Sequence, residues 1–194
     1  MNTQSHMLMG GALFGGHDRR RIAVGMLGGL APDIPQILIF ASLRMLGAQD
    51  KTIFGTLYFS NWWQIANALG HSFLLWGSLL ALAVLADRRR ASAGMSSLSV
   101  FAAAGLTHCL VDFLVHREDA HMQFWPLSRW KFVSPVSYYD PAHYGLYFAW
   151  FEATLGLSMA VLLMVRVRNL WARLGLATIA LPYAAVPAYF LLFR

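Results

Sequence analysis

The segment SLSVFAAAGLTHCLVDFLVH, residues 97–116, combines an apolar run with three ionisable side chains, His108, Asp112 and His116. Each of the three lies four residues from the next, and on an α-helix this spacing places them all on one face. Ionisable groups inside an apolar membrane-type helix are costly, and they usually have a function. Imidazole and carboxylate groups are also the donors that bind divalent metal ions. The segment therefore predicts a membrane helix that carries part of a metal site.

The rest of the chain has a similar composition, with 58% hydrophobic and only 12% charged residues. This charge content lies outside the usual range for a soluble globular domain. The net charge of +6 could suggest nucleic acid, but the arginines cluster between apolar runs, as they do in membrane loops. We therefore expect membrane lipid around the chain and no nucleic-acid partner. The single cysteine, Cys109, excludes an internal disulfide and a cysteine-rich zinc module.

Six apolar segments predict an all-α, polytopic membrane bundle of about five to six helices. The segments cover approximately residues 3–16, 22–46, 69–86, 97–115, 145–165 and 170–193. Because no linker or repeat divides the chain, residues 1–194 are expected to form a single domain. Pro32 and Pro35 should break the second helix, and residues 51–69 are typical of an interfacial or re-entrant stretch. Glycines in the first two segments should let those helices approach closely.

Arginine clusters at residues 19–21, 88–90 and 166–173 occupy alternate turns. By the positive-inside rule these turns are expected to be cytoplasmic, with the loop at residues 116–144 on the other side. At about 1.5 Å per residue, five ionisable residues lie about 18–27 Å from these turns. They are His6, Asp33, His71, His108 and Glu152. Similar depths predict that these side chains meet in the outer, non-cytoplasmic half of the bundle.

The predicted metal ligands are His6, Asp33, His71, His108, Asp112 and His116. His108 and His116 are about 11–12 Å apart along a helix, too far to share one ion. If His116 is a ligand, a second ion is needed and Asp112 could bridge the two. The cofactor is therefore expected to be a divalent metal, most simply zinc, with one or two ions per chain. The alternative for each residue is a structural hydrogen bond between helices.

Two carboxylates are predicted to be catalytic, Asp112 and Glu152. An unpaired acid in an apolar helix is penalised by the membrane, so Glu152 is expected to be a metal ligand, a general base or the partner of an arginine. Glu118 and Asp119 are expected on a solvated loop face, and His17 on the surface. Whether His121 and His143 join the site stays open.

Several short elements occur in an order that resembles a known family. They are His6, the run from Gly29 to Asp33, His71-Ser72, the run from Gly105 to His108 with Asp112, and Trp125-Pro126-Leu127-Ser128. This order resembles the LexA-regulated, membrane-bound metal-dependent hydrolase family of the bacterial inner membrane, over approximately residues 5–130. Family members often carry a further Asp and His after the Pro-Asp element, where this chain has Pro35 and Gln36.

The same order is similar to the zinc-dependent phospholipase C and S1/P1 nuclease families, which are all-helical phosphodiesterases with clustered zinc ions. This similarity implies that His6 binds one ion, that Asp33, His71 and His108 bind another, and that Asp112 bridges them. His116 would match a further histidine of those families. No His-x-x-x-Glu element for a third ion occurs here.

The sequence thus leads to the hypothesis of a multi-pass hydrolase of the bacterial inner membrane. It would use a metal-activated water to cleave an ester or phosphodiester bond in a lipid or other interfacial substrate. The alternatives are a non-enzymatic membrane protein that binds or transports metal, and a scaffold without metal. A transporter usually contains internal repeats, and none is evident in this sequence.

Overall fold

The computed structural model describes residues 1–90 and 94–193, with side chains up to residue 185. The described chain contains helices and loops only, which confirms the predicted all-α class. The helices are α1 Thr3–Phe14, α2 Arg19–Leu30, α3 Ile34–Met45, α4 Asp50–Thr52, α5 Asn61–His71, α6 Phe73–Arg89, α7 Ser97–Val115, α8 Gly145–Arg166 and α9 Leu170–Phe193. Short turns of other helix types lie at η1 Ala31–Asp33, η2 Ile53–Leu57 and η3 Pro141–His143.

Four helical stretches are long and apolar enough to cross a membrane, which indicates a membrane protein. They are Arg19–Met45, Asn61–Arg89, Ser97–Val115 and Gly145–Arg166. The predicted bundle of about five to six helices is confirmed in class, and the described residues contain more helices because breaks at Pro32 and Ser72 divide two of the predicted segments. Helix α1, with 12 residues, spans about 18 Å, less than the ~30 Å of a hydrocarbon core.

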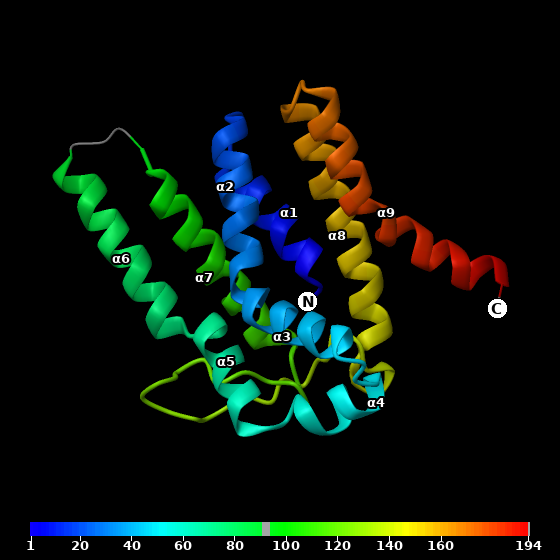
Figure 1. Ribbon diagram of the computed structural model, residues 1–194. Coiled ribbons are helices and arrows are strands. Elements are labelled where there is room, and N and C mark those ends of the chain that lie inside the picture. Colours follow the sequence, from blue (N-terminus) through cyan, green and yellow to red (C-terminus); the bar gives the residue numbers. More distant parts are fainter. Residues whose placement is uncertain (91–93, 194) are drawn as a thin grey trace.

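Two breaks interrupt the predicted helices. The first is η1, where Pro32 interrupts the second predicted helix, as expected from the sequence. After this break α3 turns across the end of the bundle (Figure 1). The second lies at Ser72, inside the segment expected to be one helix over residues 69–86. Ser72 adopts an extended conformation, and its hydroxyl accepts a hydrogen bond from the N–H of Leu75 at 3.2 Å, so it caps a new helix. Residues 51–69, expected to be interfacial or re-entrant, form α4, η2 and most of α5.

Helix α1 occupies the middle of the bundle, packed against α2, α7 and α8 (Figure 1). Backbone contact with α2 requires glycine at two crossing points. A Cβ on Gly10 would lie 2.2 Å from the carbonyl oxygen of Gly25, and one on Gly29 would lie 2.2 Å from the carbonyl oxygen of His6. The expected close approach of the first two helices is confirmed, and it brings His6 against α2.

The two ends of the bundle differ in composition. The α1–α2 turn, the end of α6 and the α8–α9 turn, which carry the arginine clusters, lie at one end (Figure 1). Helices α3, α4 and α5 and the loop before α8 lie at the other. The three arginine turns therefore share one end, as predicted. The C-terminal part of α7, with Asp112, lies toward the opposite end.

Candidate metal centre

The helix breaks at η1 and Ser72 position two ionisable side chains in one buried cluster. Asp33 ends η1, and His71 ends α5 directly before the break at Ser72. Both meet His108 and Asp112 on α7, and His6 reaches the same place from α1. All five side chains are buried, and His6 and His108 are entirely inaccessible. The structure therefore brings all six predicted ligands together around Asp112, with His6 and the sixth ligand, His116, on its Oδ1.

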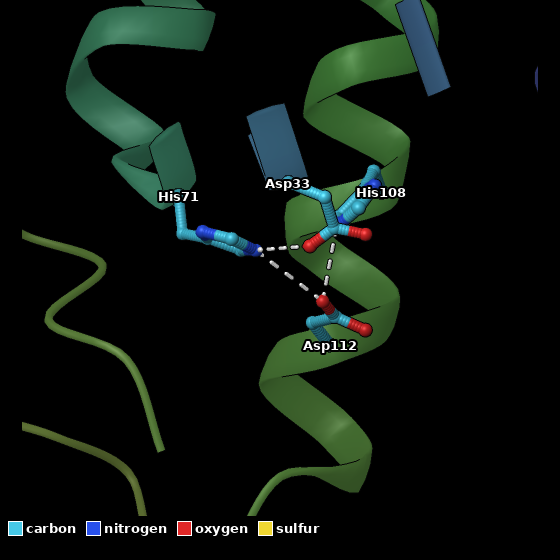
Figure 2. A group of neighbouring side chains, drawn as sticks. All are labelled: Asp33, His71, His108 and Asp112. Carbon is cyan, nitrogen blue, oxygen red and sulfur yellow. Dashed lines mark ion pairs between the residues drawn. The ribbon is translucent and has the colours of Figure 1, made fainter. Parts of the chain in front are cut away.

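Four donor atoms form what we call the inner group, namely Asp33 Oδ1, His71 Nε2, His108 Nε2 and Asp112 Oδ2 (Figure 2). His71 Nε2 lies 3.5 Å from each of the two carboxylate oxygens. His108 Nε2 lies 3.0 Å from Asp112 Oδ2 and 3.7 Å from Asp33 Oδ1. Four donors at about 2.1 Å from one ion in a tetrahedron would be about 3.4 Å apart. These four distances are close to the spacing of a tetrahedral metal site.

The tautomers of the two inner histidines are set by the backbone. His108 Nδ1 lies 2.6 Å from the carbonyl oxygen of Gly29, and His71 Nδ1 lies 3.0 Å from that of Asn67. A ring nitrogen facing a carbonyl must donate, so in the neutral ring each Nε2 keeps its lone pair. Neither Nε2 has a hydrogen-bond partner among the described residues, although both are buried. Such orphaned lone pairs next to two carboxylates fit a bound cation.

The second oxygen of Asp112 faces a different set of donors, which we call the outer group. Asp112 Oδ1 lies 2.8 Å from His6 Nε2 and 3.3 Å from His116 Nε2. The terminal amine of Met1 lies 2.8 Å from the same oxygen. His121, from the following loop, has a ligand atom within 4.8 Å of those of Asp112 and His116. The outer group thus consists of Asp112, His116 and His121, which together could hold an ion, with His6 also on Asp112 Oδ1 and the Met1 amine 3.1 Å from His116 Nε2.

The pKa values of His116 and His121 are shifted in opposite directions. Burial lowers the pKa of His121, and the neighbouring His71 and His116 lower it further. Its ring is therefore neutral at pH 7 and ready to bind a metal. Burial also disfavours the charged form of His116, but Asp112 and Asp119 outweigh this effect and raise the pKa of His116 above its ordinary value. Metal binding at His116 would therefore release a proton.

Asp119 was expected on a solvated face, and the structure corrects this. Its Oδ2 accepts a hydrogen bond from His116 Nδ1 at 2.8 Å, and its side chain is only 14% exposed. A carboxylate that holds the second nitrogen of a histidine is the usual support for a metal-binding imidazole. The spacing of three residues between His116 and Asp119 was the available signal. Glu118 and His17 are exposed, as expected.

Glu152 is not part of either group. Its carboxylate accepts hydrogen bonds from the backbone N–H of Asn2 at 2.7 Å, the side-chain amide of Asn2 at 2.8 Å and the hydroxyl of Ser5 at 2.5 Å. These contacts hold the start of α1, next to the Met1 amine that touches Asp112. The geometry favours a positioning role for Glu152 over that of a general base.

His143 lies apart from both groups, hydrogen-bonded to Asp140 at 2.6 Å in a partly exposed cluster with Glu118. Ser72 and Thr107 bond to the backbone carbonyls of Trp125 and Ala103. Cys109 is buried beside the carbonyl of Gly70, which is the place of a small packing residue.

Comparison with models of known protein families, with curated protein sequences and with solved structures found no match to this chain. The geometry of the two donor groups is therefore the basis for any conclusion about function.

Proposed function

We propose that this chain is a membrane-embedded metal-dependent hydrolase with a two-ion, zinc-type centre, acting on an ester or phosphodiester bond in a lipid or other interfacial substrate. The observation that carries the proposal is the division of Asp112 between two donor groups, with Oδ2 on the inner group and Oδ1 on the outer group. One carboxylate shared in this way suits two ions about 3.5–4 Å apart, the separation common in hydrolytic two-metal sites. Imidazole and carboxylate donors in tetrahedral spacing favour zinc among the divalent ions.

Bound ions would supply an activated water at neutral pH and would stabilise negative charge on the substrate oxygen. The protein residues have separate tasks. Asp33 and Asp112 neutralise the cations, and the backbone contacts of His71 and His108 hold their rings in one orientation. Glu152 fixes the start of α1, and Asp119 orients His116. The resemblance to membrane-bound metal-dependent hydrolases agrees with this assignment, as does the expected place in a bacterial inner membrane.

The test is Asp112→Asn in detergent-purified protein. The neutral amide keeps the size of the side chain but cannot offset the repulsion between two cations. Wild type should contain about two zinc ions per chain and hydrolyse bis(4-nitrophenyl) phosphate or a 4-nitrophenyl ester. The variant should lose at least one ion, measured by elemental analysis. Its turnover should fall by roughly 100-fold or more, the scale seen when a charge-stabilising group is removed from an active site.

Glu118→Gln is the matched control, because Glu118 is an exposed acid in the same loop region that pairs with Arg117 at 3.1 Å and belongs to neither donor group. It should retain wild-type metal and activity. Full metal content in Asp112→Asn would contradict the shared-carboxylate centre. Metal without turnover of either substrate, combined with zinc flux in liposomes, would indicate a transport protein instead.

A further inference from the structure

A pocket of about 420 Å³ lies between the first turns of α8, the middle of α9 and the start of α1. Most of the side chains around it are apolar or aromatic, among them Leu146, Ala149, Trp150, Ala153 and Pro182. Its volume is within the range of small-molecule sites, about 300–1,000 Å³. The second half of α9 bends away from α8 (Figure 1), and Pro182, which cannot donate a helical hydrogen bond, accounts for a bend there.

The pocket opens on the outer surface of α8, which is a candidate membrane span. Leu146 and Trp150 on its rim are 61% and 49% exposed, and both belong to the candidate span Gly145–Arg166. Trp150 lies about 7–8 Å along α8 from its first residue, and exposed tryptophans near the end of a membrane span are typical of the interface between headgroups and hydrocarbon. In a membrane, lipid would cover this surface, so the pocket opens toward acyl chains.

Two of the polar groups that line the pocket, the carboxylate of Glu152 and the hydroxyl of Tyr183, already have partners in the protein, and the side chain of Gln4 also lines it. Both carboxylate oxygens of Glu152 accept hydrogen bonds from Asn2 or Ser5, and the hydroxyl of Tyr183 contacts that of Ser5. A polar solute would have to leave water without gaining these groups as partners, which is unfavourable. A hydrocarbon chain has no such cost. The chemistry of the pocket therefore favours a lipid tail.

The pocket also lies beside the outer group of the metal centre. Tyr138 lines the pocket, and its ring packs against His116 of the outer group, with ring centroids 4.7 Å apart. Asn2 lines the pocket as well, and it follows Met1, whose amine contacts Asp112. A molecule whose tail fills the pocket would hold its polar end beside the outer group.

We propose that this pocket binds one hydrocarbon chain of the substrate, so that the substrate is a membrane lipid cleaved in its headgroup region. The part of this inference that concerns turnover rests on the proposed hydrolase function. Binding of the chain does not depend on it.

Chain binding is tested with Ala149→Trp, which fills the pocket from an exposed position on α8. Thr154→Trp is the matched control, because Thr154 is also exposed on α8 but does not line the pocket. The probe is a phosphatidylglycerol with a photoactivatable group near the end of one acyl chain, diluted in phosphatidylcholine vesicles. Wild type and Thr154→Trp should crosslink mainly at the pocket residues, and Ala149→Trp should lose at least about 80% of that labelling. Labelling that is spread evenly over the lipid-facing helices, or that Ala149→Trp leaves unchanged, would overturn the proposal. The crosslinking test does not require bound metal, so it can also be made on metal-depleted protein.

Turnover gives the second readout. Ala149→Trp should keep wild-type zinc content and hydrolysis of bis(4-nitrophenyl) phosphate, while its kcat/KM for a long-chain phospholipid falls at least 10-fold. An unchanged ratio between the long-chain and the soluble substrate would overturn the assignment of the bound chain to a substrate. If wild type hydrolyses neither substrate, the proposed function fails, and the crosslinking result still decides whether the pocket binds a chain.

Discussion

Asp112 has the most connected side chain of the centre, and its two oxygens are not equivalent. Oδ2 faces His71 and His108 at 3.5 and 3.0 Å, whereas Oδ1 faces His6 and His116 at 2.8 and 3.3 Å. The sequence identified Asp112 because it lies one helical turn from both His108 and His116. The direction of each oxygen depends on α1 and α5, which approach from elsewhere in the chain.

The support of His116 by Asp119 leads to a prediction for a single residue. In the wild type, the Asp119 carboxylate orients the ring of His116 and makes the ring more basic. Asp119→Asn removes this carboxylate. Loss of such a support typically weakens metal binding by about 10- to 100-fold, so the outer ion should bind more weakly by that factor while the inner ion is unaffected. Zinc titration against a chelating indicator should resolve two affinities, of which one changes. If the two zinc affinities weakened equally, or if neither changed, the division of the donors into two groups would be contradicted.

At the scale of helices, the position of His6 depends on the contact between α1 and α2. Gly29→Ala would place a methyl group 2.2 Å from the backbone oxygen of His6, and the carbonyl of Gly29 also receives His108 Nδ1. Separating the two helices should cost about 1–3 kcal/mol and should lower the zinc content. Thermal unfolding in detergent and elemental analysis measure the two effects.

Gly77→Ala provides the control for this substitution. Gly77 is also a helical glycine, in α6, and a Cβ there would meet nothing within 4 Å. This variant should be neutral or more stable by about 0.5–1 kcal/mol, because alanine favours the helix. If the two variants have the same melting temperature and zinc content, close approach of α1 and α2 does not position the centre.

At the scale of the whole molecule, bound metal should stabilise the fold. The centre joins α1, η1, α5, α7 and the loop after α7, and two buried carboxylates, Asp33 and Asp112, lie in it. With free zinc about 1,000-fold above its dissociation constant, binding would contribute about 4 kcal/mol to the free energy of unfolding. Chelation should therefore lower the melting temperature of wild type in detergent, and added zinc should restore it. The Asp112→Asn variant should respond much less, and an identical response of both proteins would mean that the chelator acts elsewhere.

The sequence by itself determined the helical class, the break at Pro32 and the face of α7 that carries His108 and Asp112. These features are local, because helical periodicity and the missing N–H of proline act over one or two turns. It also indicated His6, Asp33 and His71, since each lies at a similar distance along the chain from an arginine turn.

Only the tertiary structure decided how these donors divide between two groups and which loop residues join them. His121 lies in the loop after α7, which has no periodicity to interpret, and the spacing of three residues was the one sequence signal for the contact between His116 and Asp119. The path of this loop is fixed by contacts distant in sequence, such as Phe73 N–H to the carbonyl of Gln123 at 2.8 Å and Ser134 N–H to that of His116 at 3.1 Å. Glu152 was likewise judged from its own helix, whereas its partners Asn2 and Ser5 are about 150 residues away. Contacts of this kind depend on how the helices pack together, and no local pattern encodes them.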